Sequence, residues 1–355
     1  MEDCINLLRV HPSIGVHKKL TLLNLEGCKN LKTLPKKFEM ESLEILILSG
    51  CSKLKNIPEF GENMPRLLKL FLDGTAITKL PTSIGHLIGL ASLNIRDCKS
   101  LMCLPSSFFN LKLLKDLDMS GCLKLERLPK NLGNIKSLEK LNVRGTAIRE
   151  LHSSIGFLKN LKMLPLYECR GLTSSNNSGL GIPDFYSMPR IPNPMRLSLL
   201  LGLSSLTELK LRNCNLMAIP NVIGSLFSLK EIDLSGNNFV CLPESINGLC
   251  KLRMMELENC TSLQLLPKLP LSITTISASG CTSLNPNSLC DVEPFLSNCS
   301  QLADNQGVIS MFSIVIRKHF QVALSLSLNS LLCMFQGLYV DSRYDILSLS
   351  LTLSQ

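Results

Sequence analysis

The chain has 355 residues, enough for a large core, but it contains no Trp and only 5% aromatic residues. The predicted core is therefore aliphatic and mainly Leu, which is more typical of repeated layers than of an irregular enzyme core. The formal net charge is +9, from 37 Lys and Arg against 28 Asp and Glu. Because no basic run is interleaved with aromatic residues, the sequence predicts a solvated basic surface and no specific nucleic-acid binding.

Residues 1–19 are predicted to be a partial leading repeat, with Cys4, Leu7, Val10 and Pro12 in register with the second half of later copies. No polar capping segment precedes them, and end repeats normally need one. The expectation is therefore a fragment of a longer protein or a truncated gene product. The stretch "MEDCINLLRVHPSIG" also holds acidic residues and no sustained apolar run, so it predicts no signal peptide.

A repeat of the form L-x-x-L-x-L-x-x-C-x-x-L-x-x-L-P then runs along the chain. About seven copies fall in residues 20–172 and about four in residues 205–285, mostly 23 or 24 residues apart. The copies begin at Leu20, Leu43, Leu67, Leu90, Leu114, Leu138, Leu161, Leu206, Leu229, Leu252 and Ile273. This period and leucine spacing identify leucine-rich repeats.

The spacing within each copy predicts an α/β solenoid of horseshoe type. Alternating leucines in L-x-x-L-x-L follow the period of a strand, so one strand per copy forms a parallel sheet on the concave face. On the convex face, phrases such as "LPTSIGHLIGL" at residues 80–90 place Ile84 and Leu87 three residues apart after a proline. That pattern predicts short helical or 3₁₀ turns packed on the core.

One small residue per copy is predicted to form a structural ladder in the buried turn after each strand. Free Cys is among the most buried residue types, and Cys-x-x-Cys or Cys/His metal pairs are absent from the sequence. These residues therefore favour a reducing, intracellular compartment, with no metal site and no cofactor. The ladder comprises Cys28, Cys51, Thr75, Cys98, Cys122, Thr146, Cys169, Cys214, Asn237, Cys260 and Cys281.

Two segments depart from the repeat. Residues 173–204 are rich in Ser, Asn, Pro and Gly and are predicted to be a surface loop or an excursion from the solenoid. Residues 286–355 are predicted to be a truncated post-repeat segment with a low-complexity tail. Residues 320–340 carry no charge, which raises a membrane span as an alternative, although Gln321, Asn329 and Gln336 are poor for lipid.

The repeats resemble those of plant intracellular immune receptors. The phrases "LNLEGCKNLKTLP", "LFLDGTAITKLPTSIGHL", "LPKLPLSITTISASGCTSL" and "LSNCSQLADNQG" are similar to the class with a Toll/interleukin-1-receptor-like domain, such as the family of tobacco mosaic virus resistance protein N. The resemblance covers roughly residues 4–320. It implies recognition of proteins by the repeats. The family's nucleotide-binding activity is not implied here, because the sequence has no Gly-Lys pair and hence no phosphate loop.

The resemblance implies a recognition module of plant innate immunity, in the cytoplasm or also the nucleus. Its expected partners are a pathogen effector or guarded host protein, and the nucleotide-binding domain of a full-length receptor in cis or in trans. No small-molecule substrate and no enzyme activity are expected, since neither H-E-x-x-H nor G-x-S-x-G occurs. The alternatives are a membrane-anchored leucine-rich repeat receptor-like protein and a truncated decoy that does not signal.

Binding is expected at the variable positions of the strands, which face the concave solvent while the leucines hold the core. These positions carry charges of both signs and two aromatic residues, and aromatic and Arg side chains are common at binding hot spots. The predicted partner surface comprises Phe71, Arg96, Asp118, Arg144, Tyr167, Lys210 and Arg212.

Overall fold

The computed structural model describes residues 1–62, 64–148, 151–167, 200 and 202–285. These residues all belong to one compact unit, Met1–Leu302, and the second unit, Ala303–Gln355, lies outside them. The predicted post-repeat segment and most of the predicted 173–204 excursion also lie outside the described residues, as does the uncharged stretch 320–340.

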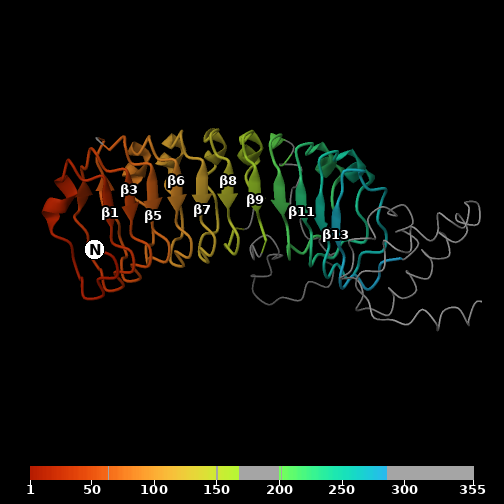
Figure 1. Cartoon of the computed structure of the whole chain (residues 1–355), viewed down its shortest axis with the longest axis horizontal. Helices are drawn as coiled ribbons and strands as arrows, with labels where there is room; N and C mark the ends of the chain where they lie inside the picture. The colour runs from red at the N-terminus through yellow and green to blue at the C-terminus, as the bar shows by residue number, and fades with distance from the viewer. Residues whose placement is uncertain (63, 149–150, 168–199, 201, 286–355) are drawn as a thin grey trace, which may run out of the picture. The chain divides into compact units, whose positions relative to one another are not determined.

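The predicted leucine-rich repeat solenoid is confirmed, because each of the eleven copies contributes one strand to a single parallel sheet (Figure 1). The strands follow one another in chain order. They are β1 (Leu22–Asn24), β3 (Ile45–Ile47), β5 (Lys69–Phe71), β6 (Ser92–Asn94), β7 (Asp116–Asp118), β8 (Lys140–Asn142), β9 (Met163–Pro165), β10 (Glu208–Lys210), β11 (Glu231–Asp233), β12 (Met254–Glu256) and β13 (Thr275–Ser277).

The register of the sheet stacks one leucine on the next. Leu23 pairs with Leu46, and Leu46 pairs with Leu70. These three side chains are 3% exposed or less, whereas the residues on either side of them in the strands are partly or fully exposed. This alternation is the period of two expected of a strand with one buried face. Because each copy covers the apolar face of its neighbour, the core runs continuously along the repeats.

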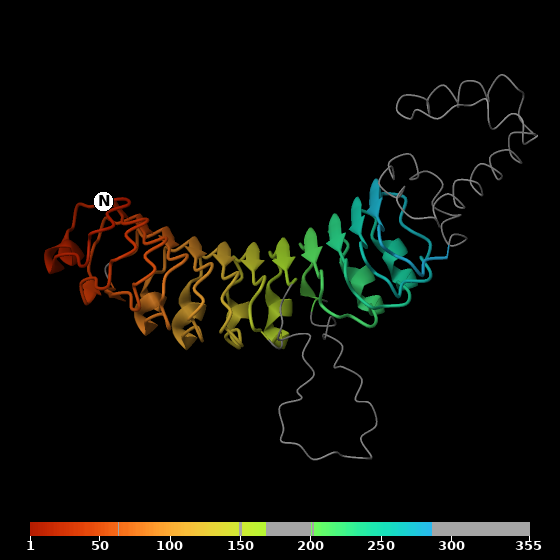
Figure 2. The ribbon, with the colours of Figure 1, turned by 90° about the horizontal axis from the view of Figure 1, so that it is seen from below.

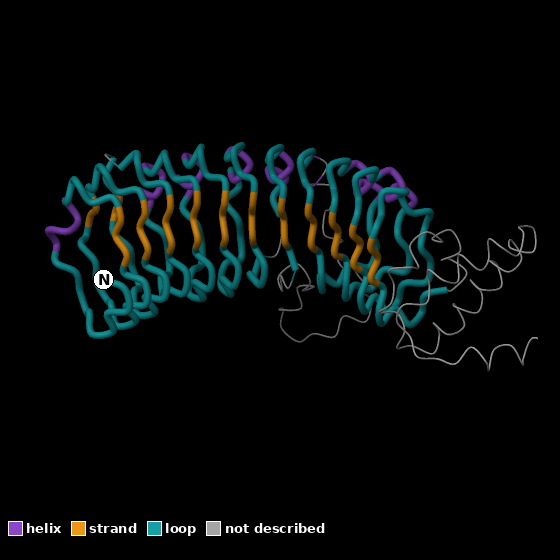
Figure 3. The backbone as a smooth tube through the Cα atoms, viewed as in Figure 1, coloured by secondary structure: helices purple, strands orange, loops and turns teal. Residues whose placement is uncertain are grey.

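Short 3₁₀ turns follow the strands on the outer side of the repeat unit (Figures 2 and 3). In η2, Pro81 precedes the turn, and the apolar pair Ile84 and Leu87 is fully buried. The expected pairing of such residues with a 3₁₀ turn is therefore confirmed here. The turns are η1 (Pro12–Val16), η2 (Thr82–His86), η3 (Ser106–Asn110), η4 (Leu132–Asn134), η5 (Ser153–Phe157), η7 (Asn221–Ser225) and η8 (Glu244–Gly248).

The copies that begin at Leu20 and Leu43 differ, because extended segments replace the expected 3₁₀ turns there. Two short strands, β2 (Lys37–Phe38) and β4 (Glu59–Phe60), pair in parallel and bury both phenylalanines. This second sheet ends at the next copy, where Ser83 Oγ accepts the backbone N–H of Phe60 at 2.9 Å. The expectation of helical turns along the whole convex side is therefore wrong for these two copies.

In the described turns after the strands, a residue directly before the ladder position lies in the left-handed region. Gly121 lies there with a φ of +72°, and a Cβ at this position would sit 2.2 Å from Asp97 Oδ1 of the preceding copy. Asp97 itself takes the equivalent position with a φ of 54°. A copy with Asp at this position thus requires Gly in the next, because the Asp side chain occupies the space of a Cβ. The same order recurs at Asn213 and Gly236.

Residues 1–19 pack against the first complete copy. The backbone N–H of Asp3 donates to the carbonyl of Glu26 at 2.7 Å, and Arg9 forms a parallel β-bridge with Thr33. The carbonyl of Met1 accepts the Cys28 thiol at 3.1 Å. The leading residues thus occupy the place of a preceding repeat.

Candidate functional site

The structure places the described ladder residues in the buried turn between the strand and the convex side. Cys28, Cys51, Cys98, Cys122 and Cys260 have no exposed surface, and Cys281 is partly exposed. Cys169 lies outside the described residues. The buried residues with at most 3% exposure also include Cys214, Thr75, Thr146 and Asn237.

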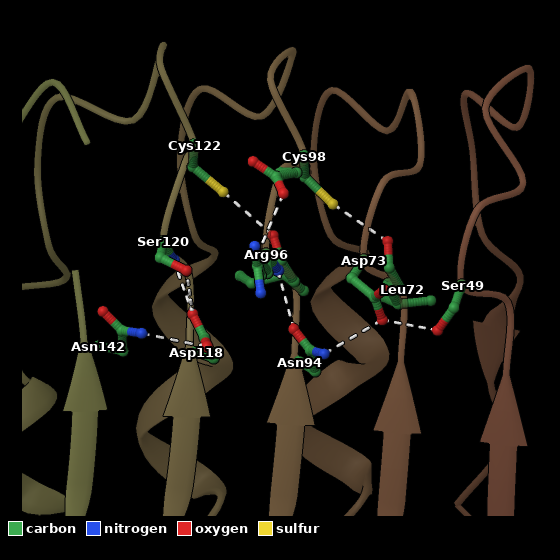
Figure 4. Close-up of polar contacts among 12 residues, drawn as sticks. Ser49, Leu72, Asp73, Asn94, Arg96, Cys98, Asp118, Ser120, Cys122 and Asn142 are labelled. Atoms are coloured by element: carbon green, nitrogen blue, oxygen red, sulfur yellow. Dashed lines mark hydrogen bonds and ion pairs between the residues drawn. The ribbon is translucent and has the colours of Figure 1, made fainter. Parts of the chain in front are cut away.

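Each ladder cysteine that the structure describes donates its thiol to a backbone carbonyl of the preceding copy or, for Cys28, of the leading residues. The Cys51 thiol donates to Leu25 O at 3.2 Å and the Cys122 thiol donates to Ile95 O at 3.1 Å. Figure 4 shows the thiol bonds of Cys122 and of Cys98, which donates to Leu72 O at 3.2 Å. Burial raises the pKa of the Cys51 thiol and of the Cys98 thiol to about 11. These thiols therefore remain protonated donors at neutral pH and are poor nucleophiles.

Threonine and asparagine satisfy the same turn in other ways. Thr75 Oγ1 donates to Leu72 O of its own copy at 2.7 Å. Asn237 Oδ1 accepts the N–H groups of Cys214 and Leu216, and its Nδ2 donates to two carbonyls, Leu211 O at 2.9 Å and Leu234 O at 2.6 Å. One buried amide thus serves four backbone groups in two neighbouring copies.

On the concave face, the last residue of several strands forms a hydrogen bond with its own backbone. The side-chain oxygen accepts the backbone N–H two residues later: Asn94 from Arg96 at 3.0 Å and Asn142 from Arg144 at 3.2 Å. Asp118 accepts the N–H of Ser120 in the same way at 2.8 Å. Asn and Asp favour such local side-chain to backbone bonds. Their recurrence on the strands is therefore partly structural.

Two carboxylates link neighbouring strands on this face (Figure 4). Asp73 Oδ1 accepts Ser49 Oγ at 2.6 Å and Asn94 Nδ2 at 3.1 Å. Asp118 Oδ2 accepts Asn142 Nδ2 at 3.2 Å, while its Oδ1 also accepts Ser120 Oγ at 2.6 Å. The concave side chains are therefore linked in two groups, one in the copies of β3, β5 and β6 and one in the copies of β7 and β8.

A depression of about 710 Å³ lies at the end of strands β6 to β9, and we call it the central depression. Four of the seven residues predicted to bind a partner line it, namely Arg96, Asp118, Arg144 and Tyr167. The guanidinium of Arg144 lies over the Tyr167 ring at 4.6 Å and donates Nη1 to Tyr167 Oη at 3.3 Å. The complete lining is Arg96, Asp97, Asp118, Ser120, Gly121, Leu123, Asn142, Arg144, Gly145, Tyr167 and Asn213.

The other three predicted residues lie apart from the central depression. Phe71 lines a smaller depression of about 360 Å³ along β5 to β9, which shares Asp118 and Asn142 with the central one. Arg212 pairs with Glu258 two copies away, Nη2 to Oε2 at 3.3 Å. Lys210 lies on β10, where it pairs in register with Asp233 of β11.

The copies after β10 carry acidic side chains on the concave face, at Asp233, Glu256 and Glu258. Burial and the nearby Asp233 carboxylate raise the pKa of Glu256 on β12. Glu258 accepts Ser277 Oγ in addition to its pair with Arg212. Lys210 and Arg212 therefore face acidic neighbours.

Several residues that line the central depression were not predicted, including Asp97, Ser120, Asn142 and Asn213. A signal for two of them exists in the sequence. Asp97 and Asn213 stand where most copies have glycine before the ladder residue. They flank Gly121 and Gly145 in the lining of the depression.

In the described part of the chain, no group of three His, Cys, Asp or Glu side chains is arranged to hold a metal ion. Over the same residues, no helix has the length and apolar character needed to cross a membrane.

Comparisons with known proteins place these features in a family. The family description "Leucine-rich repeat region" matches residues 19–180, and "Leucine Rich Repeat" matches residues 228–249. Solved structures that this chain resembles include a functional domain of InlJ from Listeria monocytogenes. The sequence identity is 14% and the TM-score is 0.47, and the match covers 75% of this chain and 61% of that one.

Curated relatives come from Arabidopsis thaliana. The chain is 39% identical over 308 residues to the disease resistance-like protein DSC1, which is 80% of this chain and 23% of that protein. It is 38% identical over 101 residues to the disease resistance protein RPP2A, which is 28% of this chain and 8% of that protein. The chain thus spans less than a quarter of either relative. Its repeats and sheet identify it as a leucine-rich repeat region, and its sequence is similar to parts of plant disease resistance proteins.

Proposed function

We propose that the chain is a protein-recognition module of plant innate immunity, which binds a partner protein at the central depression of its concave face. The partner is a pathogen effector or a guarded host protein. The nucleotide-binding domain of a full-length receptor, in cis or in trans, is the second expected partner. Protein recognition in the cytoplasm or nucleus agrees with the relationship to disease resistance proteins and with the free thiols of the described cysteines.

The observation that carries this proposal is the convergence of predicted binding residues on one hollow of the sheet. Tyr167 provides an amphipathic ring, and Arg144 and Arg96 are exposed. Tyr and Arg are the residue types most enriched at interface hot spots. Because Arg144 is stacked on Tyr167 and its backbone is fixed by Asn142, binding would order few further rotamers.

Binding is favoured over catalysis by the state of the polar groups in the depression. The Asp118 carboxylate accepts three hydrogen bonds from Ser120 and Asn142. These bonds join the carboxylate to its own turn and to the next copy, so it acts as a structural link across the sheet. The depression is therefore proposed as a recognition surface and not as an active site.

A matched pair of aromatic substitutions tests the proposal. Tyr167→Ala removes the ring from the central depression, and Phe157→Ala removes a ring that is 63% exposed on the convex turn η5. Effectors and host proteins displayed on yeast would be screened against the full chain, and the dissociation constants of the binders measured. We expect Tyr167→Ala to weaken binding by about tenfold or more, as at a hot spot, and Phe157→Ala to leave it unchanged. Equal effects, or a larger effect of Phe157→Ala, would refute the concave site.

A further inference from the structure

Two arginines occupy the same position in copies that are two repeats apart. Arg96 and Arg144 each lie two residues beyond the end of their strands, β6 and β8, and both side chains are exposed. Neighbouring strands are about 4.8 Å apart, so two strand steps place their backbones roughly 10 Å apart. The copy between them has Ser120 at this position, which is only 7% exposed.

The backbone of each arginine is held by an asparagine two residues earlier. Asn94 accepts the backbone N–H of Arg96 at 3.0 Å and donates to Asp73 of the preceding copy. Asn142 accepts the backbone N–H of Arg144 at 3.2 Å and donates to Asp118 of the preceding copy. In both cases an asparagine is bonded to the backbone of the arginine and to a carboxylate of the preceding copy. Figure 4 shows Asn94 between Asp73 and Arg96, and Asn142 bonded to Asp118. The two arginine backbones are thus fixed before any partner arrives.

The residues between the two arginines have small side chains, and the Asp118 carboxylate beside them already accepts hydrogen bonds. Gly121 contributes no side chain, and Ser120 Oγ donates to Asp118. Arg96 engages Asp97 through Nε at 3.2 Å, and its side chain remains 63% exposed. A guanidinium has five N–H donors, so the pair of Arg96 with Asp97 does not use all of them. The side chain of Arg144 is exposed beside Tyr167, where a partner can reach it. The arrangement offers two fixed groups of donors on either side of a hollow.

We propose that the central depression binds an acidic protein segment, which presents two carboxylates roughly 10 Å apart, one to Arg96 and one to Arg144. This inference rests on the proposed function and names the chemistry of the partner. Guanidinium groups pair with carboxylates in short, charge-assisted hydrogen bonds. The intervening Ser120 and Gly121 leave room for the backbone that joins the two acids.

A selection from a random peptide display library against the full chain tests the proposal. We expect the recovered peptides to share a pair of Asp or Glu residues at a fixed separation. Replacing either acid by Gln is expected to weaken binding by about tenfold, the size of a hot-spot contact. Arg96→Ala and Arg144→Ala should each cause a similar loss for the same peptides.

The control variant carries Lys130→Ala and Lys136→Ala together. Both lysines are exposed and flank the convex turn η4. This variant therefore loses as many positive charges as a double arginine variant that carries Arg96→Ala and Arg144→Ala together. Its peptide binding should stay within about twofold of the unchanged chain, because exposed charges at a distance are screened by salt. A loss equal to that of the double arginine variant would overturn the proposal.

Other outcomes separate this inference from the proposed function. Peptides that lose binding on Tyr167→Ala but contain no acidic pair would overturn the acidic segment and leave concave recognition standing. Peptides indifferent to Tyr167→Ala would refute both. Binding of a single-stranded oligonucleotide as tight as that of the peptides, and equally sensitive to the arginines, would also overturn the acidic protein segment as occupant.

Discussion

The ladder and the concave strand face both place polar residues once in every copy, yet they use them differently. Ladder side chains bond to backbone groups that every copy possesses, such as Leu25 O for Cys51. Concave side chains bond to their own backbone and also to side chains of neighbouring copies, as Asn142 does to Asp118. A backbone partner never changes between copies, so the ladder tolerates few residue types. A side-chain partner varies with its neighbour, and the concave face is free to specify a ligand.

This difference predicts that ladder substitutions act on folding and concave substitutions act on binding. The largest expected effect is at Asn237, where Asn237→Ala would remove the side-chain bonds to four buried backbone groups, of which Leu234 O keeps the bond from the Cys260 thiol. We expect the free energy of unfolding to fall by about 3 kcal/mol or more. Urea unfolding followed by circular dichroism would measure it. A loss below about 1 kcal/mol would show that other groups or water satisfy the turn.

The turn between the concave strand face and the ladder offers two glycines for a matched comparison, Gly121 and Gly145. Gly121→Ala would meet Asp97 Oδ1 at 2.2 Å, whereas Gly145→Ala would meet nothing nearer than 3.8 Å, and both have positive φ. Both should lose about 1–2 kcal/mol from backbone strain, and Gly121→Ala should lose more because Asp97 must move. Thermal unfolding of the two variants measures the difference. Equal losses would show that the contact between copies is unimportant.

The buried thiols predict a pH dependence. The pKa of Cys51 and of Cys98 is raised by burial from 9.0 to about 11. The unfolded thiols release protons first as pH rises, so the folded state is favoured fully below pH 9 and this stabilisation is lost between about pH 9 and 11. A chain with Cys51→Ala and Cys98→Ala should lose less stability across that interval. Urea unfolding at several pH values compares the two chains, and parallel curves would contradict the prediction.

The smallest effect on stability is expected on the concave face. Arg144→Ala removes an exposed contact with Tyr167, which is worth about 0.5–1 kcal/mol. The melting temperature should therefore hardly change while partner binding falls. A differential scanning measurement beside a binding titration separates the two effects. A large drop in melting temperature would place Arg144 among the structural residues.

The leucine spacing was sufficient to predict the strands and their parallel order, because it reports directly which side chains must be buried. The extended convex segments at Phe38 and Phe60 were not predicted, since they depend on pairing between two particular copies. The contact of Asp97 with the turn at Gly121 and the bond from Asn142 to Asp118 were not predicted either. These contacts join different copies, and a single repeat pattern does not encode them. The central depression arises from such contacts, so only part of its lining was predicted.

Hydrogen–deuterium exchange of the full chain, with and without a protein partner recovered by display, tests the central claim most directly. The account predicts slower exchange on binding in residues 94–97, 118–121 and 142–145, which end the strands at the central depression. Segments on the convex side, such as η3 and η5, should exchange at unchanged rates. Protection confined to those convex turns, with no change along the concave strands, would contradict it.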